Sequence, residues 1–186
     1  MKHLLLFLLI SFISADRLIT KSQWVHDLIV LARDRQSEYR NKWPYNVLYY
    51  DGQKWYADCV NINKALFNGR NINDFTVGGY QRTLSNTGDI TVERMIELCT
   101  DRSTNFNKLK SNEPRILHMS GHIGAYLGQV VEYGGASYNV VEATASFGHK
   151  IALSWIDSDG TRRAKKGGST NGKWYQHGIP SLWVRY

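Results

Sequence analysis

The chain has 186 residues and a mass of 21.3 kDa, with 42% apolar and 21% charged residues, which suits one compact domain and is too short for two enzyme-sized cores. Six Trp, eleven Tyr and six Phe exclude a chain that is disordered throughout. The 23 Lys and Arg outnumber the 16 Asp and Glu, and the resulting net charge of +7 favours anionic partners such as nucleic acid, acidic membranes or acidic cell-wall polymers.

The first fifteen residues have the features of a secretory signal peptide. Lys2 gives a basic start, an apolar run follows over residues 4–13, and the small residue Ala15 precedes the expected cleavage point. The apolar run is shorter than the roughly twenty residues that span a bilayer. We therefore expect a secreted, extracellular product, residues 16–186, that forms one domain, acts as a monomer and does not insert stably into membranes.

Helical spacing of apolar residues occurs in three segments of the first half. Residues 24–32, 59–69 and 90–99 each predict a helix. Residues 42–54 contain Pro and Gly among aromatic residues and predict a loop that leads into the second helix. Cys59 falls in the first turn of that helix.

From residue 115 the pattern changes to short runs rich in Val, Ile, Tyr and Trp, separated by glycines, which is typical of strands. The predicted strands are residues 115–120, 122–127, 138–145, 150–156 and 182–186. Helices followed by a meander of strands predict an α+β domain, with the helices packed on one side of an antiparallel sheet.

Cys59 has the position of an activated nucleophile. A cysteine attacks as thiolate, and a helix N-terminus stabilises a thiolate through unpaired backbone amides and the positive end of the helix dipole. Asp58 precedes Cys59 and is a natural N-cap. The amide of Cys59 is a candidate donor to an oxyanion.

His122 is the strongest candidate for the general base. In a strand its side chain shares one face with Gly124 and Tyr126, while the apolar residues between them fill the core, as we expect for a histidine on a sheet edge that faces a cleft. His118 lies four residues earlier with the same parity and is an alternative base, although a surface or subsite role is expected for it.

Glu142 is the best candidate to orient the imidazole of His122. It is the sole acidic residue in the apolar strand at residues 138–144, which follows the strand of His122 and is expected to lie beside it. A lone carboxylate in such a run needs a positive or hydrogen-bonding partner. Asn139 is the alternative, with the opposite side-chain parity.

In this order and context, the residues resemble the NlpC-type cell-wall cysteine peptidases, a family with a compact papain-like fold that includes lysin-type members. The family's Asp-Cys segment is similar to residues 56–59, its histidine strand to residues 122–128, and its following strand to residues 140–145. Residues 174–183 are similar to the end of lysin-type members, and the resemblance covers about residues 45–186. The chain departs from the family at Glu142, where His, Asn or Gln is usual, and after Cys59, where Val60 and Asn61 replace Ser and Gly.

The resemblance implies a peptidoglycan hydrolase that cleaves amide bonds in stem peptides through a thioester acyl-enzyme. Cys59, His122 and Glu142 are then catalytic, and Tyr56, Asp58 and His118 contact the substrate or the oxyanion. The mechanism needs neither a metal nor an organic cofactor. The Cys spacing of 99 minus 59, or 40 residues, also matches no zinc motif.

Four alternatives stay open. A disulfide between Cys59 and Cys99 would abolish the mechanism. Wall amidases named for their dependence on cysteine and histidine use Cys, His and Glu in this order and are the closest enzymatic rival. A catalytically silent wall-binding domain is the third alternative. A nucleic-acid binder is disfavoured because the basic residues are scattered and no recognition motif is present.

Two further groups of residues favour structural roles. Residues 162–168 hold the densest basic cluster, Arg162, Arg163, Lys165 and Lys166, which we expect to be a flexible solvated loop. His177 lies beside Gly and Pro in a predicted turn and is expected to be structural.

Overall fold

The computed structural model of the protein describes residues 18–33, 39–42, 45–50, 53–56, 59–67, 91–148 and 150–186. The helices are α2 (Lys21–Arg33), α3 (Asn61–Phe67), α5 (Val92–Glu97) and the 3-10 helix η3 (Phe106–Lys108). The strands are β1 (Ile19–Thr20), β2 (Tyr39–Lys42), β3 (Tyr45–Tyr50), β4 (Gln53–Tyr56), β5 (Thr100–Ser103), β6 (Arg115–Met119), β7 (His122–Tyr133), β8 (Ala136–Thr144), β9 (Lys150–Ile156), β10 (Thr161–Arg163), β11 (Thr170–Lys173), β12 (Gln176–Ile179) and β13 (Val184–Arg185). The predicted signal peptide lies outside the described residues.

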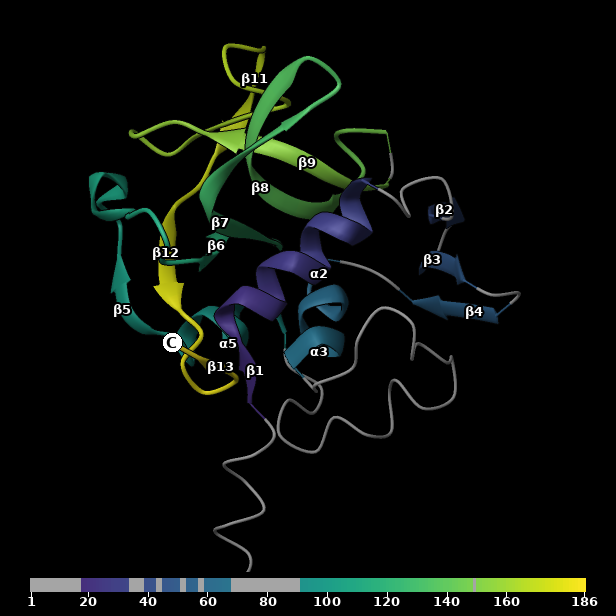
Figure 1. Ribbon diagram of the computed structural model, residues 1–186, viewed down its shortest axis with the longest axis horizontal. Coiled ribbons are helices and arrows are strands. Elements are labelled where there is room, and N and C mark those ends of the chain that lie inside the picture. The colour runs from purple at the N-terminus through teal and green to yellow at the C-terminus, as the bar shows by residue number, and fades with distance from the viewer. Residues whose placement is uncertain are drawn as a thin grey trace, which may run out of the picture.

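An eight-stranded sheet forms the centre of the fold. Its strand order is β11-β10-β9-β8-β7-β6-β12-β5, and all neighbouring strands run antiparallel. Helix α2 lies against β8 and β9, and α5 lies against β6 (Figure 1). The prediction of an α+β fold built on a large antiparallel sheet is therefore confirmed.

The two faces of the sheet carry different clusters of buried side chains. On one face, Ile123, Ala125 and Leu127 of β7 pack with apolar residues of α2, α3 and α5. On the other face, a smaller cluster contains Val140 and Trp174. The alternation expected along β7 is thus correct, and residues with the parity of His122 lie on the face opposite the helices.

The N-terminal helix and the C-terminus are held together by aromatic packing. Phe67 stacks on Trp183 with ring centroids 5.1 Å apart, and its ring lies 5.3 Å from that of Trp24. All three side chains are fully buried, and the burial of each contributes about 1.5–3 kcal/mol to the stability of the fold. Strand β13 also pairs in parallel with β1, so the described ends of the chain lie side by side (Figure 1).

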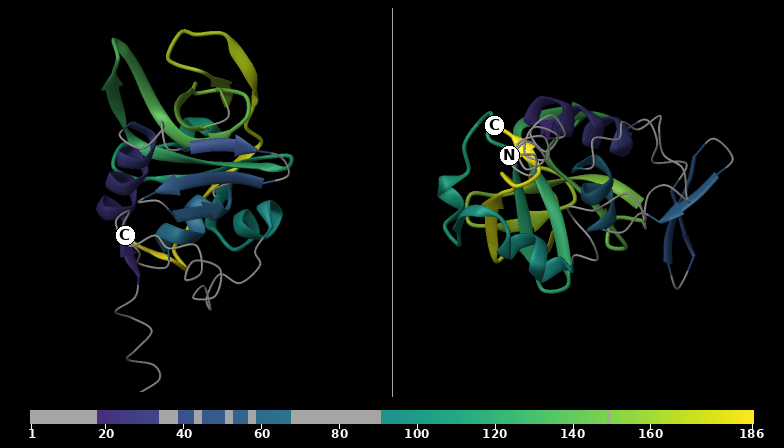
Figure 2. Two further views of the ribbon diagram at one scale, coloured as in Figure 1. Left: turned by 90° about the vertical axis from the view of Figure 1, so that its right-hand side faces the viewer. Right: turned by 90° about the horizontal axis from the view of Figure 1, so that it is seen from below.

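The predicted loop at residues 42–54 is wrong, because the structure has strands there. Strands β2, β3 and β4 form a three-stranded antiparallel sheet, seen at one side of the molecule in Figures 1 and 2. Tyr50 pairs with Gln53 across the two residues Asp51 and Gly52. Asp-Gly is typical of two-residue hairpins, a signal stronger than the loop composition that suggested otherwise.

Strand β7 is longer than predicted, extending to Tyr133, and forms a long hairpin with β8. The prediction ended at residue 127 because Gly128 was interpreted as a breaker. In the structure Gly128 has a φ of 68°, and the register with β8 shifts between Tyr126 and Val131, so the glycine marks an irregularity within a continuing strand. A Cβ at this position would lie 2.7 Å from the backbone nitrogen of Glu113.

The strand predicted at residues 182–186 is mostly wrong. Only Val184–Arg185 is a strand there, and β12 (Gln176–Ile179) enters the large sheet instead, between β5 and β6. His177 therefore lies in a strand and not in a turn. Short strands such as β5, β10 and β11 were not predicted, since three or four polar residues carry no visible alternation.

Candidate functional site

Cys59 lies in the turn immediately before α3, which begins at Asn61 rather than at residue 59. The buried side chain of Asn63 fixes this turn, because its Nδ2 donates to the carbonyl oxygen of Cys59 at 3.2 Å. The Oδ1 of Asn63 accepts a hydrogen bond from Nε1 of Trp24 at 3.3 Å. The cysteine backbone is thus tied to α2 through one amide side chain, which sequence analysis did not identify.

The structure contains no disulfide between the two cysteines. Cys99 is buried, its Sγ donates to the carbonyl oxygen of Met95 at 3.3 Å, and burial raises the pKa of its thiol to about 12. Cys99 therefore remains a protonated thiol at neutral pH. Cys59 is half-buried and lines a pocket.

His122 begins β7, after a tight turn at Gly121. Its Nε2 lies 2.6 Å from Oε2 of Glu142, and its ring stacks on Trp174 at 5.5 Å between centroids. Strand β7 is in the middle of the large sheet, so the predicted position on a sheet edge is wrong. The imidazole lies instead at the end of a central strand.

Glu142 is fully buried and accepts hydrogen bonds from three side chains. The donors are Nε2 of His122, Oγ of Ser154 at 2.5 Å, and Nε and Nη2 of Arg162 at 3.0 and 2.7 Å. Burial alone raises the pKa of Glu142, but the hydrogen bonds and charges of His122 and Arg162 hold that pKa below its ordinary value. Glu142 is therefore ionised, and the partner that a lone carboxylate requires is supplied by two basic side chains.

The bond to Glu142 fixes the tautomer of His122. A carboxylate can only accept, so Nε2 carries the proton that it donates. In the neutral imidazole Nδ1 then has the lone pair, and this nitrogen is able to take a proton from another group.

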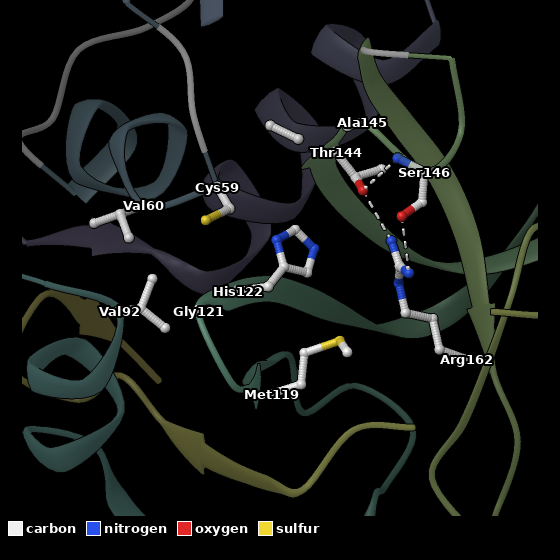
Figure 3. A pocket seen from close by; sticks show the side chains of 11 residues that line it. Cys59, Val60, Val92, Met119, Gly121, His122, Thr144, Ala145, Ser146 and Arg162 are labelled. Atoms are coloured by element: carbon white, nitrogen blue, oxygen red, sulfur yellow. Dashed lines mark hydrogen bonds between the residues drawn. The ribbon is translucent and has the colours of Figure 1, made fainter. Parts of the chain in front are cut away.

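The pocket beside His122 has a volume of about 500 Å³ and is also lined by Cys59. In Figure 3 the ring of His122 lies between Cys59 on one side and Arg162 on the other. One wall of the pocket is apolar and contains Val60, Val92 and Met119. The opposite wall consists of residues 143–146, whose side chains are small. The pocket lies where β7 begins and β8 ends, so the thiol from the helix layer and the imidazole from the sheet meet at one end of the strands.

Arg162 was not recognised as a site residue. The basic cluster at residues 162–168 predicts a solvated loop, whereas Arg162 lies in β10 with 2% of its surface exposed. Its Nη2 also donates to Oγ1 of Thr144 at 2.9 Å, and its Nη1 donates to the carbonyl and side-chain oxygens of Asn171 at 2.9 and 3.1 Å. Its neighbour Arg163 forms an ion pair with Asp157 at 2.6 Å. Of the four basic residues predicted to be solvated, only Lys165 and Lys166 are exposed.

The other predicted site residues do not join this group. His118 lies in β6, on a different strand from His122, and its parity places it on the opposite sheet face from Met119, which lines the pocket. It is buried, and Nε2 of Gln176 donates to its Nδ1 at 3.2 Å. Burial lowers the pKa of His118. The expected surface role and the expected shared parity with His122 are both wrong.

Asn139 has the parity expected and a structural role. Its amide accepts from the backbone nitrogen of Ile156 at 2.8 Å and donates to the carbonyl oxygen of the same residue at 3.1 Å. It therefore bridges β8 to β9 and leaves Glu142 as the partner of His122. Tyr56 ends β4, but its side chain and the whole of Asp58 lie outside the described residues.

His177 belongs to a separate cluster of polar side chains around the buried Arg115. Its Nδ1 accepts from Nη1 of Arg115 at 3.1 Å, and its Nε2 donates to the carbonyl oxygen of Asn105 at 3.1 Å. Arg115 also pairs with Asp101 at 2.5 Å and Glu113 at 2.6 Å. The cluster joins β5, β6 and β12.

Among the described residues no group of three or more His, Cys, Asp or Glu side chains is arranged to hold a metal ion. No helix in the described ranges has the length and apolarity needed to span a membrane.

The fold and the site together define an α+β protein with a thiol, an imidazole and a carboxylate gathered at one end of a central antiparallel sheet. Comparison with protein-family models, with curated proteins and with solved structures found no match to this chain.

Proposed function

We propose that the protein is a cysteine hydrolase that cleaves amide bonds with Cys59 as nucleophile, His122 as general acid and base, and Glu142 as the residue that orients the imidazole. The observation that carries this proposal is the 2.6 Å bond from His122 to the buried Glu142 beside a pocket that Cys59 also lines. A carboxylate, an imidazole and a nucleophile in one pocket are the parts that covalent catalysis requires.

In the proposed reaction, Nδ1 of His122 takes the proton of the Cys59 thiol as the sulfur attacks the carbonyl carbon of an amide. The carbonyl oxygen becomes an oxyanion, for which backbone amides near Cys59 are the candidate donors. Collapse of this intermediate breaks the C–N bond, and His122 returns the proton to the leaving amine. Water, deprotonated by the same nitrogen, then hydrolyses the thioester and regenerates the thiol.

The proposed substrate is the stem peptide of peptidoglycan, and the proposed fold is the papain-like fold of the NlpC-type peptidases. The sequence resemblance at residues 56–59 and 122–128 supports both. The net charge of +7 and the predicted signal peptide suit an enzyme that meets an anionic wall outside the cell. A pocket with one apolar wall and one wall of small residues accommodates short aliphatic side chains such as alanine.

A wall amidase that removes the whole stem peptide from the glycan is the second candidate. The observation that favours it is Glu142 itself, since the related cysteine- and histidine-dependent amidases resemble this chain in using Glu as the third residue. The chemistry at Cys59 is the same for both candidates, and the two differ only in the bond cut.

The test is digestion of peptidoglycans of several chemical types by the secreted form, residues 16–186, with mass spectrometry of the released fragments. New amino termini within stem peptides indicate an endopeptidase, and intact stem peptides released from glycan indicate an amidase. Cys59→Ala is expected to abolish release, whereas Cys99→Ala, the matched change at the buried thiol, is expected to retain it.

An unchanged fragment pattern with every peptidoglycan type would overturn the proposed hydrolysis. If the protein still sediments with the wall in that experiment, the silent wall-binding alternative is the correct one.

A further inference from the structure

Arg162 is bound into the centre of the site by hydrogen bonds to Glu142, Thr144 and Asn171. It reaches Glu142 from β10, two strands away, and contacts both carboxylate oxygens with Nε at 3.0 Å. Ser154 of the intervening β9 contacts the same carboxylate. The three side chains share one sheet face with His122, because Ser154 pairs with Val140 and Arg162 pairs with Ile156, and Val140 and Ile156 belong to the cluster on the face opposite the helices.

The carboxylate of Glu142 and the guanidinium of Arg162 form a buried ion pair. Glu142 is fully buried and Arg162 is 2% exposed, so neither charge is screened by water. The guanidinium carbon of Arg162 also lies over two aromatic rings, 4.5 Å from the ring centroid of Phe147 and 5.8 Å from that of Trp174. Toward His122, the pair therefore presents a hydrogen-bond acceptor whose negative charge is cancelled.

We propose that Arg162 is a positioning residue of the hydrolytic site, which locks the carboxylate of Glu142 toward His122 and cancels its charge, so that the pair orients the imidazole as a neutral acceptor would. The inference rests on the proposed function. It also accounts for a glutamate at a position where the resembled family has neutral residues, because a carboxylate neutralised by a buried guanidinium is electrostatically closer to an amide than to a lone anion.

Other charged groups around His122 do not substitute for Arg162. On α5, Glu93, Arg94 and Glu97 are exposed. On β6, His118 lies on the opposite sheet face. From the helix layer, Cys59 is the ionisable group that shares the pocket. Within the described part of the chain, Arg162 is thus the cation bound to Glu142.

The test compares Arg162→Met with Arg163→Met in the secreted form. Arg163 is the adjacent residue of the same strand, it has an ion pair of its own with Asp157, and its replacement removes the same unit of charge. We expect Arg162→Met to lower amide hydrolysis at least about tenfold, the size of coupling seen within one network, while Arg163→Met changes it little.

A readout independent of the substrate is the NMR titration of the His122 imidazole. Without Arg162 the charge of Glu142 is uncompensated and stabilises the imidazolium, so the midpoint of this titration is expected to rise by about one pH unit. In the double variant Arg162→Met with Glu142→Gln, the midpoint is expected to return toward that of the unmodified protein. An unchanged midpoint in a folded Arg162→Met variant would overturn the inference, even if hydrolysis were lost.

Arg162→Lys provides the second variant if Arg162→Met does not fold. Lysine keeps the charge but loses the fork that contacts both carboxylate oxygens. We expect the midpoint to stay within about 0.3 pH unit and hydrolysis to fall several-fold, because charge is retained and orientation is lost. A rise in the midpoint as large as one pH unit in this variant would contradict charge cancellation. If the unmodified protein cleaves no peptidoglycan, the proposed substrate fails while the titration still decides the role of Arg162.

Discussion

At the scale of single residues, sequence reasoning identified groups with local signals and missed those that depend on strand register. Cys59 was recognisable from its predicted place in the first turn of a helix, and His122 and Glu142 from polar residues interrupting apolar strands. Arg162 carried no such signal, because its role follows from β10 pairing with β9 and from Ser154 lying between them. A buried carboxylate implies a cation, but the sequence offers several.

Glu142→Gln is expected to reduce both activity and stability. The amide keeps an acceptor for one donor, but Arg162 is left as a buried cation without its counter-ion, which costs about 3 kcal/mol in comparable broken pairs. Urea unfolding and hydrolysis rates measure the two effects. The control is Glu132→Gln, an exposed carboxylate of β7 whose replacement should leave both unchanged. Equal free energies of unfolding for the two variants would show that breaking the Glu142–Arg162 pair does not destabilise the fold, contrary to this prediction.

Asp27→Asn is expected to stabilise the protein at neutral pH by about 1 kcal/mol. Asp27 is buried in α2, and burial raises its pKa. Its Oδ2 has no hydrogen-bond partner among the residues that the structure describes, while Oδ1 accepts from Gln23 at 2.6 Å. Because Asp27 binds a proton more readily in the folded protein than in the unfolded chain, its carboxylate destabilises the folded state most when it is ionised. The advantage of Asn should therefore shrink as the pH falls toward 4 in denaturation experiments, and a constant advantage would contradict the explanation.

At the scale of elements, the long periodic segments were predictable and the short polar ones were not. Helix α2 and strands β8 and β9 follow from alternation or helical spacing of apolar residues over seven positions or more. Strands β2, β3 and β4 required the hairpin signal at residues 51–52 to outweigh the loop composition. Strands β10 and β11 are short and polar, and they form only because the edge of the large sheet offers them backbone partners.

Gly124→Ala is expected to lower activity by disturbing the packing beneath His122. A Cβ at residue 124 would lie 2.7 Å from the ring of Trp174, which stacks on His122. Such overpacking costs about 1–3 kcal/mol and would displace the indole that supports the imidazole. The double variant with Trp174→Phe makes room for the methyl group and should recover stability relative to Gly124→Ala alone. Without such recovery in thermal unfolding, the close approach to Trp174 would not be the cause.

At the scale of the whole molecule, two groups of charged side chains, around the buried Glu142 and the buried Arg115, join distant parts of the chain. The Glu142 group links β7, β8 and β10, and the Arg115 group links β5, β6 and β12. Tyr186 at the C-terminus donates to the carbonyl oxygen of Pro114, beside the second group. Since each group joins several strands of the large sheet, its protonation affects the stability of the whole fold rather than of one loop.

The free energy of unfolding is expected to fall as the pH drops below about 7, before the carboxylates protonate. Burial lowers the pKa of His177 and of His118, so both stay neutral in the folded protein at pH values where the unfolded chain binds a proton near the ordinary value of 6.5. The free energy of unfolding then decreases as the pH falls from about 6.5 to the lowered pKa that each histidine has in the folded protein. The decrease is at most about 1.4 kcal/mol per pH unit for each histidine. Urea unfolding at several pH values between 5 and 8 measures this slope.

His177→Gln is the variant that isolates one of the two groups. A glutamine can accept from Arg115 and donate to the carbonyl oxygen of Asn105, but it does not titrate. The slope between pH 7 and pH 5 should therefore be smaller in this variant and smaller again when His118→Gln is added. A slope as steep in the double variant as in the unmodified protein would assign the acid sensitivity to the carboxylates instead. The pKa of Glu142 is lowered by His122 and Arg162, and that of Asp101 by Arg115, so both carboxylates lose their stabilising contribution only near and below pH 4, where unfolded carboxylates begin to protonate.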